Sequence, residues 1–255
     1  MERSLLEKSL EKLPDLTIIA NKAPRCQYDA SCTNPPLDKE AFCEQHLSSP
    51  LKTQLSGSEP PYEPDRWNTE FVQRVHNCFA YALNLLSPSL VEKCKKGICD
   101  THQPGAKSQW PDMNEKTCPN VIGRILGDDT YIPADFTDKC KRGTSMIAFI
   151  VDKKRDYHVL RLDDTGYFSH KGGQGPATNL DAQGHRIADV RLANFDYSNK
   201  PDKLFYDQFC GYFCISRSGV KAAVPAGGRR TRRRRQRQRQ QRKSMTRLLR
   251  RRSGK

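Results

Sequence analysis

The chain has 255 residues, of which 36% are hydrophobic, and its formal net charge is +15 at pH 7. This length can hold one domain of ordinary size with smaller appendages, and the mean hydropathy of −0.80 is low for a single compact domain. No apolar stretch approaches the roughly 20 residues that a membrane helix needs, so the sequence argues against a membrane-spanning protein.

The first predicted element is a short surface helix within an N-terminal segment, residues 1–23, that ends in a linker. Leucines recur at helical spacing from Leu5 to Leu13, and Pro14 ends the pattern. The segment lacks the apolar core of a signal peptide. We therefore expect an intracellular protein, located in the cytoplasm or nucleus of a cell.

Residues 24–47 are predicted to form a small zinc-binding module. Its ligands would be Cys26, Cys32, Cys43 and His46, in the spacing Cys-x5-Cys-x10-Cys-x2-His. Three thiols and one imidazole suit a closed, structural zinc site, and so short a segment would depend on the metal for most of its folding free energy. The pattern resembles small Cys-Cys-Cys-His zinc modules that occur beside other domains, and its partner could be a protein or a nucleic acid. Disulfides and unrelated reduced thiols are the alternatives, and the missing secretory signal disfavours disulfides.

A linker rich in proline, serine and glycine, residues 48–61, leads toward a short apolar helix that begins at Asn77-Cys78. Asparagine is a favourable N-cap residue, and a thiol in the first turn faces unpaired backbone N–H groups at the positive end of the helix dipole. We expect this position to lower the pKa of Cys78 and favour the thiolate, which makes Cys78 a candidate nucleophile. The alternative is a packing cysteine. His76 is interpreted as local structure, or as a substitute base.

Five further metal-ligating side chains follow this helix: Cys94, Cys99, His102, Cys118 and Cys140. We expect the four cysteines to be unpaired thiols packed under a long loop. A second metal site is the alternative, because Cys-x4-Cys-x2-His is a compact spacing. Near the end of the domain, Cys210 and Cys214 have the same parity on a predicted strand, residues 209–215, and are interpreted as core residues.

A strand hairpin that carries two histidines lies between these cysteines. The predicted strands are residues 146–151, 157–162 and 167–170, with a turn at 164–166. This pairing places His158 roughly opposite residue 172. The rings of His158 and His170 would therefore be close neighbours if they share a face of the sheet.

An Asn-Cys dipeptide that opens a helix, followed by a strand hairpin with a His-Val pair and a second histidine twelve residues later, resembles the NlpC/CHAP-type branch of the papain-like cysteine hydrolases. The resemblance covers residues 60–217. It implies an α+β domain over 62–217, in which the Cys-bearing helix packs on an antiparallel sheet. It also implies that Cys78 is the nucleophile, His158 the general base and His170 the group that orients His158. Catalysis by such a site needs no cofactor.

Two sequence blocks, Tyr62 to Asn68 and Ser169 to Gly173, also look like a bacterial and large-DNA-virus subgroup of these proteins. The resemblance implies a peptide, an isopeptide or another amide as the substrate. A zinc module, a papain-like domain and a basic tail together look more like a viral protein. Host cytoplasm, host nucleus and virion are then the expected locations.

The C-terminal tail, residues 218–255, is predicted to be flexible and strongly basic. Residues 229–255 contain 15 Lys or Arg residues and no acidic residue, whereas the rest of the chain is formally neutral. The candidate nucleic-acid-binding residues are Arg229, Arg230, Arg232, Arg233, Arg234, Arg235, Arg237, Arg239, Arg242 and Lys243. The dense charge predicts nonspecific nucleic-acid binding or nuclear targeting, and no aromatic residue interrupts it to support base stacking. A merely solvated end is the alternative.

The sequence therefore predicts a cysteine peptidase or amidase with a Cys-His-His site, a structural zinc module and a tail for nucleic-acid binding or nuclear targeting. The alternative is a non-enzymatic nucleic-acid-binding or virion structural protein built on an inactive papain-like scaffold.

Overall fold

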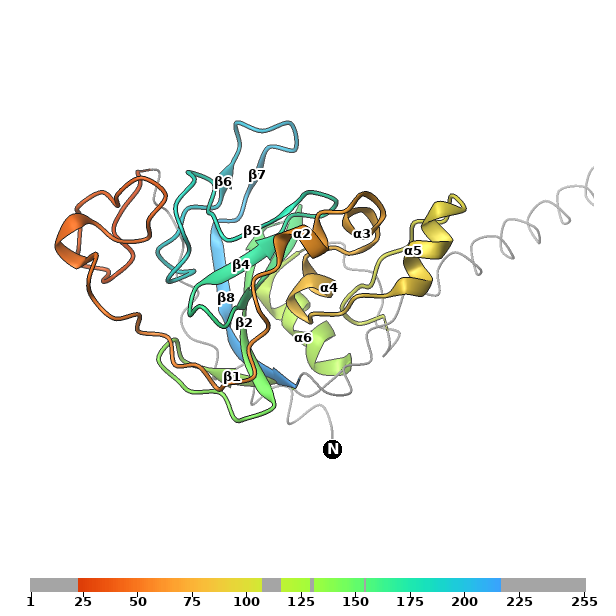
Figure 1. Cartoon of the computed structure of the whole chain (residues 1–255), viewed down its shortest axis with the longest axis horizontal. Helices are drawn as coiled ribbons and strands as arrows, with labels where there is room; N and C mark the ends of the chain where they lie inside the picture. Colours follow the sequence, from red (N-terminus) through yellow and green to blue (C-terminus); the bar gives the residue numbers. More distant parts are fainter. Residues whose placement is uncertain (1–22, 107–115, 129–130, 154, 217–255) are drawn as a thin grey trace, which may run out of the picture.

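The computed structural model describes residues 23–106, 116–128, 131–153 and 155–216 (Figure 1). The predicted N-terminal helix and the basic tail lie outside these ranges. The helices are the 3-10 helix η1 (Glu44–His46) and the α-helices α2 (Pro64–Trp67), α3 (Glu70–Val75), α4 (Cys78–Ala82), α5 (Pro88–Lys95) and α6 (Cys118–Asp128). The strands are β1 (Tyr131–Ala134), β2 (Thr144–Asp152), β3 (Asp156–Leu162), β4 (Phe168–Lys171), β5 (Ala177–Thr178), β6 (Asp196–Tyr197), β7 (Leu204–Phe205) and β8 (Gln208–Ser216). No helix in the described ranges is long and apolar enough to cross a membrane.

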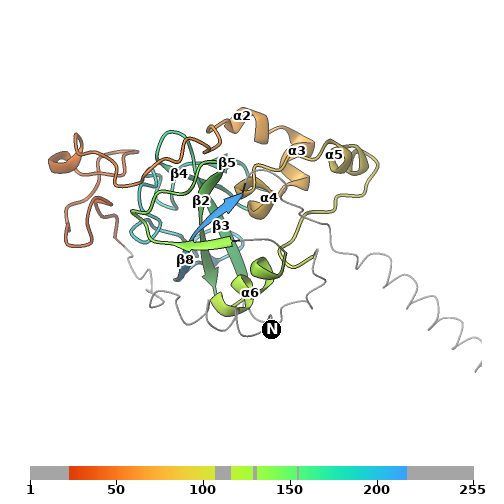
Figure 2. The same ribbon diagram turned by 90° about the horizontal axis from the view of Figure 1, so that it is seen from below.

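Six strands form one antiparallel sheet in the order β1-β8-β2-β3-β4-β5, and β6 pairs with β7 in a separate ribbon. Helix α4 packs on β3 and β4, and α6 packs on β2 and β8, as Figures 1 and 2 show from two directions. The structure is therefore a mixed α+β arrangement of helices on an antiparallel sheet, which confirms the predicted fold class at this level.

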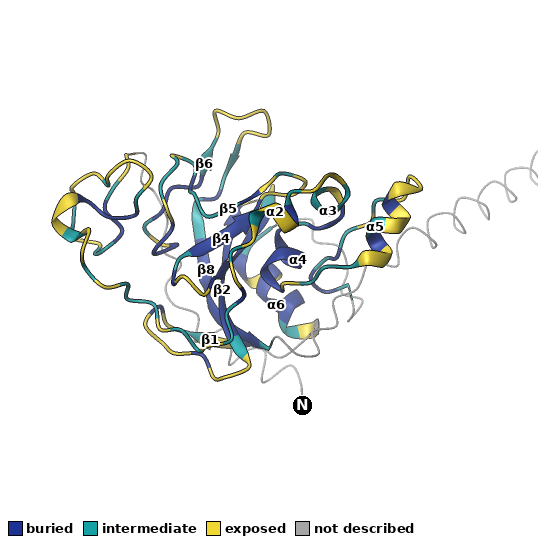
Figure 3. Cartoon of the chain, viewed as in Figure 1, coloured by how far each residue is buried: buried dark blue, intermediate teal, exposed yellow. Residues whose placement is uncertain are grey.

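Each face of the sheet has its own apolar core. Phe79 of α4 and Ile125 of α6 pack with Phe149 of β2 on the face that the helices cover. On the other face, Leu160 of β3 packs with Phe195, which lies in the long segment before β8. Because side chains on a strand alternate between the two faces, β2 needs apolar residues at nearly every position. The buried strands, α4 and most of α6 are dark in Figure 3, whereas the outer side of α5 is exposed.

The predicted hairpin that carries the two histidines is confirmed. Leu160 pairs with His170 across β3 and β4, and this register would place His158 opposite residue 172, as the sequence predicted. The turn between the strands includes Gly166, whose φ is 82°. Glycine adopts such a conformation without steric penalty, which explains its place in this turn.

Helix α4 is shorter than the sequence predicted. Asn84 adopts a left-handed conformation with a φ of 51°. Its N–H donates to the carbonyl of Tyr81 at 2.9 Å, and the N–H of Leu85 donates to the carbonyl of Ala80 at 2.9 Å. These two bonds form a Schellman C-cap, and asparagine tolerates the left-handed conformation better than most residues. The cap ends the helix before the apolar spacing ends.

The cysteines of the insertion form disulfides, so the prediction of unpaired thiols is wrong. The disulfides are Cys94–Cys99, Cys118–Cys210 and Cys140–Cys214. The alternative of a second metal site is contradicted too, because Cys94 and Cys99 bond to each other and leave His102 without thiol co-ligands. The six cysteines instead link α5 to the segment after it, α6 to β8, and the segment between β1 and β2 to β8.

The sequence parity of Cys210 and Cys214 suggested that the two side chains share a face of the sheet. A β-bulge explains why they do not. The pairing of β8 with β2 shifts between Phe149 and Ile150, opposite Gly211, whose φ is 128°. A bulge adds one residue to a strand and so reverses the alternation of side chains beyond it. Cys210 therefore packs in the core under the helices, whereas Cys214 packs in the core on the other face.

Candidate functional site

The candidate active site lies where α4 begins, beside the start of β3. Asn77 caps α4, as predicted: its Oδ1 accepts a hydrogen bond from the N–H of Ala80 at 3.1 Å. The Nδ2 of the same side chain donates to the carbonyl of His102 at 2.8 Å. Asn77 therefore fixes the first turn of α4, and with it Cys78, against the insertion that follows α5.

Cys78 lines a pocket with a volume of about 510 Å³. The other lining residues are Asn77, Thr101, Gln103, Pro104, Lys116, Arg124, Asp156, Tyr157, His158, Gly173 and Gln174. Hydrogen bonds hold the wall that the insertion contributes: Tyr157 Oη donates to Gln103 Oε1 at 2.7 Å, and Arg124 Nε donates to the carbonyl of Pro104 at 2.8 Å. Cys78, which lines the same pocket, is only 5% exposed.

Cys78 is a neutral thiol in this structure, so the predicted lowering of its pKa is wrong. Burial, with a smaller effect from the negative charge of Asp156, raises the pKa of Cys78 to about 12. Desolvation disfavours a charged group. For Cys78, desolvation outweighs the field at the start of α4, which would favour the thiolate.

The structure brings the two histidines together and fixes their tautomers. His158 Nε2 lies 2.9 Å from His170 Nδ1, and His170 Nε2 lies 2.9 Å from the carbonyl oxygen of Leu180. A carbonyl oxygen only accepts, so Nε2 of His170 carries the proton. In the neutral ring, Nδ1 of His170 then accepts the Nε2–H of His158. The remaining nitrogen of His158, Nδ1, is therefore unprotonated and can act as a base.

Both imidazoles are neutral at pH 7. Burial lowers the pKa of His158 well below its ordinary value, and the positive charge of Lys171, together with that of His170 when this ring is protonated, acts in the same direction. Burial also lowers the pKa of His170, although the hydrogen bond to the carbonyl of Leu180 opposes this effect. Neutral rings are the form in which His158 can accept a proton.

The side chain of Cys78 and the rings of the histidine pair lie on opposite faces of the sheet. Cys78 packs with Val159 in the core under the helices, whereas the ring of His158 packs against Tyr206, at a centroid distance of 5.2 Å, on the other face. Within the described residues, Cys78 Sγ makes one long contact of 4.0 Å with the carbonyl oxygen of Tyr157 and no hydrogen bond with His158 or His170. Cys78 and His158 are nevertheless both among the residues that line the same pocket.

The four predicted metal ligands, here called the metal cluster, converge. The ligand atoms of Cys26, Cys32, Cys43 and His46 all lie within 4.8 Å of one another. Nδ1 of His46 lies 3.4 to 3.6 Å from the three sulfurs, and the sulfurs of Cys32 and Cys43 are 3.8 Å apart. A tetrahedral zinc ion with ordinary bond lengths would separate two sulfurs by about 3.8 Å and a sulfur and a nitrogen by about 3.6 Å. The cluster is therefore compatible with a structural metal.

Comparison with known proteins gives one informative relative. The chain is 33% identical over 156 residues to "Insoluble matrix shell protein 1" from Ruditapes philippinarum, and the match covers 60% of this chain and 88% of that protein. This chain belongs to the same family as that protein. No family model and no solved structure matches the chain.

The structure adds Lys171 to the candidate site, a residue that the sequence analysis did not single out. Its side chain is completely buried, and Nζ donates to the carbonyls of Gln73 and Gly173, both at 2.7 Å. Burial lowers the pKa of Lys171 to about 8. Because Lys171 follows His170 on β4, it faces the same side of the sheet as Cys78, where its charge would stabilise a thiolate. The position of Lys171 directly after His170 on a predicted strand was the one feature of the sequence that could have indicated its place near the site.

Arg161 is the second residue that sequence reasoning missed, and it anchors the end of α4. The guanidinium is fully buried and donates to the carbonyls of Tyr81 and Pro61, both at 3.0 Å, and to Oδ1 of Asn84 at 3.1 Å. Its Nε pairs with Asp163 at 2.9 Å. Arg161 therefore holds α4, the linker before α2 and β3 together. An arginine in an otherwise alternating strand gave no indication of this role.

His76 has a structural role, which agrees with the sequence interpretation. Its Nδ1 lies 2.8 Å from the carbonyl oxygen of Val72, and its Nε2 accepts from the N–H of Ser87 at 2.9 Å. Both ring nitrogens are thus engaged, and the ring joins the end of α3 to the start of α5. The predicted nucleic-acid-binding residues of the tail lie outside the described residues.

Proposed function

We propose that this chain is a cysteine hydrolase of the NlpC/CHAP type that cleaves an amide bond through Cys78, His158 and His170. One observation carries the proposal: six of the ten cysteines form disulfides and three belong to the metal cluster, which leaves Cys78 as the single remaining thiol. That thiol lines a pocket together with a histidine whose free nitrogen is set by the other histidine. A packing cysteine would need neither feature.

The proposed reaction is acyl transfer through the thiol. Nδ1 of His158 accepts the proton of Cys78, and the sulfur attacks the amide carbonyl while the backbone N–H of Cys78 donates to the developing oxyanion. His158 then gives the proton to the leaving amine. His158 then takes a proton from water, which attacks the acyl group and releases it from Cys78. His158 finally gives this proton to the released thiolate. His170 keeps Nδ1 of His158 unprotonated at the start of each cycle.

The resting arrangement must change before this reaction can start, because Cys78 and the ring of His158 lie on opposite faces of the sheet. Cys78 is buried and protonated, and its sulfur contacts the backbone of β3 instead of the ring of His158. Catalytic hydrogen bonds are often long in the free enzyme and shorten when substrate binds. We propose that substrate entry into the pocket brings the thiol and Nδ1 of His158 within reach of each other.

Alkylation of Cys78 tests this proposal directly. The rate of reaction with iodoacetamide is measured by peptide mass mapping as a function of pH in the wild type, in His158→Ala and in Glu92→Gln, an exposed control on α5. Iodoacetamide is itself a small amide, so the proposal expects its entry into the pocket to bring Cys78 and His158 together. Cys78 should then react near neutral pH in the wild type and the control, and lose this reactivity in His158→Ala. Equal rates in all three proteins would eliminate His158 as the base.

We also propose that the metal cluster holds a structural zinc ion. The distances between the ligand atoms support it, as does the N–H of Cys43, which donates to Cys26 Sγ at 3.3 Å and would stabilise a metal-bound thiolate. Native mass spectrometry of the purified chain would show one zinc per molecule, and Cys32→Ser would reduce this content. A chain that stays folded with its three thiols free in the presence of zinc would contradict the proposal.

A second candidate function is a non-enzymatic matrix protein on an inactive papain-like scaffold. The buried, protonated Cys78 and the relative named as an insoluble shell matrix protein support it. Disulfides are typical of proteins that fold in an oxidising compartment, so the three bonds favour an extracellular location over the intracellular one expected from the sequence. The alkylation experiment separates the two functions, because a scaffold requires no reactive thiol.

The basic tail is proposed to bind polyanions. Nucleic acid is the partner that its arginine density favours, whereas an extracellular location would favour acidic matrix polymers. Both would be bound mainly through counterion release, with little sequence specificity.

A further inference from the structure

The module that carries the metal cluster is joined to the domain through the side chain of Gln27. Gln27 Nε2 donates to the carbonyl of Arg186 at 2.8 Å, and its Oε1 accepts from the N–H groups of Ala188 and Asp189 at 2.7 and 3.2 Å. The side chain is buried, with 3% exposure. Gln27 follows Cys26, a ligand of the cluster, directly in the sequence.

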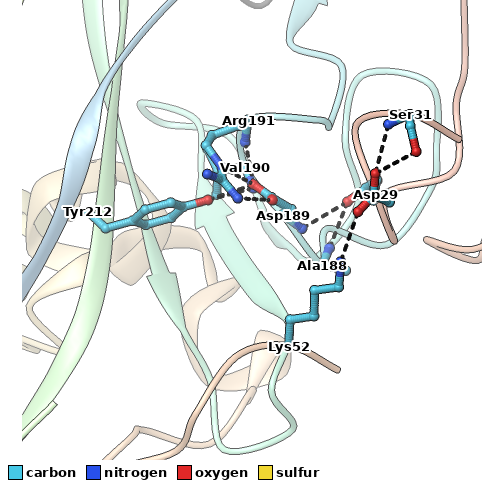
Figure 4. A network of polar contacts seen from close by, with 9 residues as sticks. Asp29, Ser31, Lys52, Ala188, Asp189, Val190, Arg191 and Tyr212 are labelled. Carbon is cyan, nitrogen blue, oxygen red and sulfur yellow. Dashed lines mark hydrogen bonds and ion pairs between the residues drawn. The ribbon is translucent and has the colours of Figure 1, made fainter. Parts of the chain in front are cut away.

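The segment that Gln27 binds is firmly anchored at its far end. Asp189 accepts a hydrogen bond from Tyr212 of β8 at 2.8 Å and pairs with Arg191 at 2.6 Å. Figure 4 draws both contacts as dashed lines. Gln27 is thus a buried link between this anchored segment and the module, beside the N–H of Arg186, which donates to the carbonyl of Lys39 at 3.2 Å. Ala188 extends the same contact, since it packs in the apolar cluster of Cys26, Phe42 and Cys43.

From this segment, backbone pairing leads to the histidines. Arg186 forms a β-bridge with Leu180, and Ile187 donates to the carbonyl of Asn179 at 3.1 Å. The carbonyl of Leu180 is the acceptor for Nε2 of His170. The acceptor that sets the tautomers of both histidines therefore belongs to a backbone hairpin that Gln27 holds from the other side.

We propose that Gln27 is a positioning residue for the His158–His170 pair, and that through it the metal state of the cluster controls the orientation of that pair. A segment as short as the module has too little core to fold without metal. Loss of the metal would therefore release Gln27, the bridge between Arg186 and Leu180 would loosen, and His170 would lose its fixed acceptor. The effect on Cys78 rests on the proposed function, whereas the effect on the ring tautomers does not.

The test uses the full zinc-loaded chain labelled with 15N-histidine and compares the wild type with Gln27→Leu and Glu40→Gln. Two-bond 1H–15N spectra near pH 7.5 report which nitrogen of each ring is protonated, and the signals are assigned with His158→Gln and His170→Gln. Glu40 forms a partly exposed ion pair with Arg186 at 3.4 Å across the same contact. Exposed ion pairs contribute little, so Glu40→Gln is the matched control.

We expect a single Nε2–H tautomer on both rings in the wild type and in Glu40→Gln. Gln27→Leu should lose the single tautomer of His170 while it retains one zinc per chain, and its rate of Cys78 alkylation should fall on the order of tenfold. If Gln27→Leu loses zinc or unfolds, a second experiment on the wild type replaces this variant. A chelator first removes the zinc, and zinc is then added back. A reversible change of tautomer in that series then supports the proposal.

Unchanged tautomers in folded Gln27→Leu, or after zinc removal, would overturn the inference. A changed tautomer together with a Cys78 alkylation rate that does not depend on His158 would have a different meaning. In that case Gln27 positions the histidines, but the hydrolase function is wrong.

Discussion

The Nε2 atom of His158 lies 2.9 Å from the Nδ1 atom of His170, which in turn presents its Nε2 to a backbone carbonyl. This chain of hydrogen bonds has one direction, because the carbonyl can only accept. It leaves the basic nitrogen of His158 on the side of the ring away from His170.

The first prediction concerns His170. In His170→Ala, His158 loses its acceptor and populates both tautomers, so the alkylation rate of Cys78 at neutral pH should fall by about tenfold or more. His170→Asn should restore part of the rate, since an amide oxygen can accept the Nε2–H of His158. Mass-mapped alkylation kinetics measure both. If the asparagine variant is no better than the alanine variant, the role of His170 is packing and not orientation.

The second prediction concerns stability as a function of pH. The folded-state pKa values of His158 and His170 lie below the unfolded value of about 6.5. The unfolded chain therefore binds more protons below that pH, and the free energy of unfolding should fall as the pH is lowered from 7 toward 5. Urea unfolding at several pH values measures the slope.

The matched variant for this experiment is His158→Gln/His170→Gln, which should reduce the slope but not abolish it. Burial also lowers the pKa values of His76 and His102, so these two rings still contribute. A slope identical to that of the wild type would show that the histidine pair is not buried in its neutral form.

The third prediction compares two disulfides. Cys118–Cys210 closes a loop with a sequence separation of 92, whereas the separation for Cys94–Cys99 is 5. Loop-closure entropy predicts that Cys118→Ala/Cys210→Ala lowers the free energy of unfolding by about 4.5 kcal/mol and Cys94→Ala/Cys99→Ala by about 2 kcal/mol. Denaturant titrations provide both values. A larger loss of stability in Cys94→Ala/Cys99→Ala would contradict this ranking. It would indicate that the Cys94–Cys99 bond stabilises the wall of the pocket directly.

The fourth prediction concerns the buried pair of Arg161 and Asp163. Arg161→Met removes the hydrogen bonds that hold α4 and leaves the Asp163 carboxyl without its partner. Burial already raises the pKa of Asp163 to about 6, so the variant should lose roughly 3–5 kcal/mol of stability. Arg161→Met/Asp163→Leu should recover part of this loss. If the double variant is as unstable as the single one, the contacts of Arg161 with α4 dominate.

The fifth prediction concerns the tail. If ten of its basic side chains contact duplex phosphates, the logarithm of the binding constant should fall with the logarithm of salt concentration with a slope of about −9. Deletion of residues 229–255 should remove this salt dependence. Titrations of labelled duplex DNA at several salt concentrations measure the slope. Tight binding by the truncated chain would assign nucleic-acid binding to the metal module instead.

Local patterns in the sequence were sufficient to predict the structural features that depend on residues close to one another in the chain. The cap at Asn77, the hairpin register of His158 and His170, and the convergence of the metal cluster each depend on spacing within a short segment. These are the predictions that the structure reproduces, because turns and strand alternation fix such geometry locally.

Long-range features could not be predicted in this way. The extra residue of the bulge at Cys210-Gly211 reverses the parity of β8, and no local pattern indicates it. The disulfide partners of Cys210 and Cys214 lie on distant segments, so their pairing follows from the tertiary fold alone. The pKa of Cys78 was predicted in the wrong direction because the burial of its thiol depends on packing against distant segments, among them α6 and β3.

The bond between Cys118 and Cys210 has a consequence for how proteolysis of the molecule is detected. A protease that cuts anywhere between these two positions leaves two fragments that are still covalently joined. Such a nicked molecule would run as one species on a gel until a reducing agent is added. Cleavage in this region would therefore go undetected in any assay that keeps the disulfides intact. The domain can be cut there and still retain both fragments.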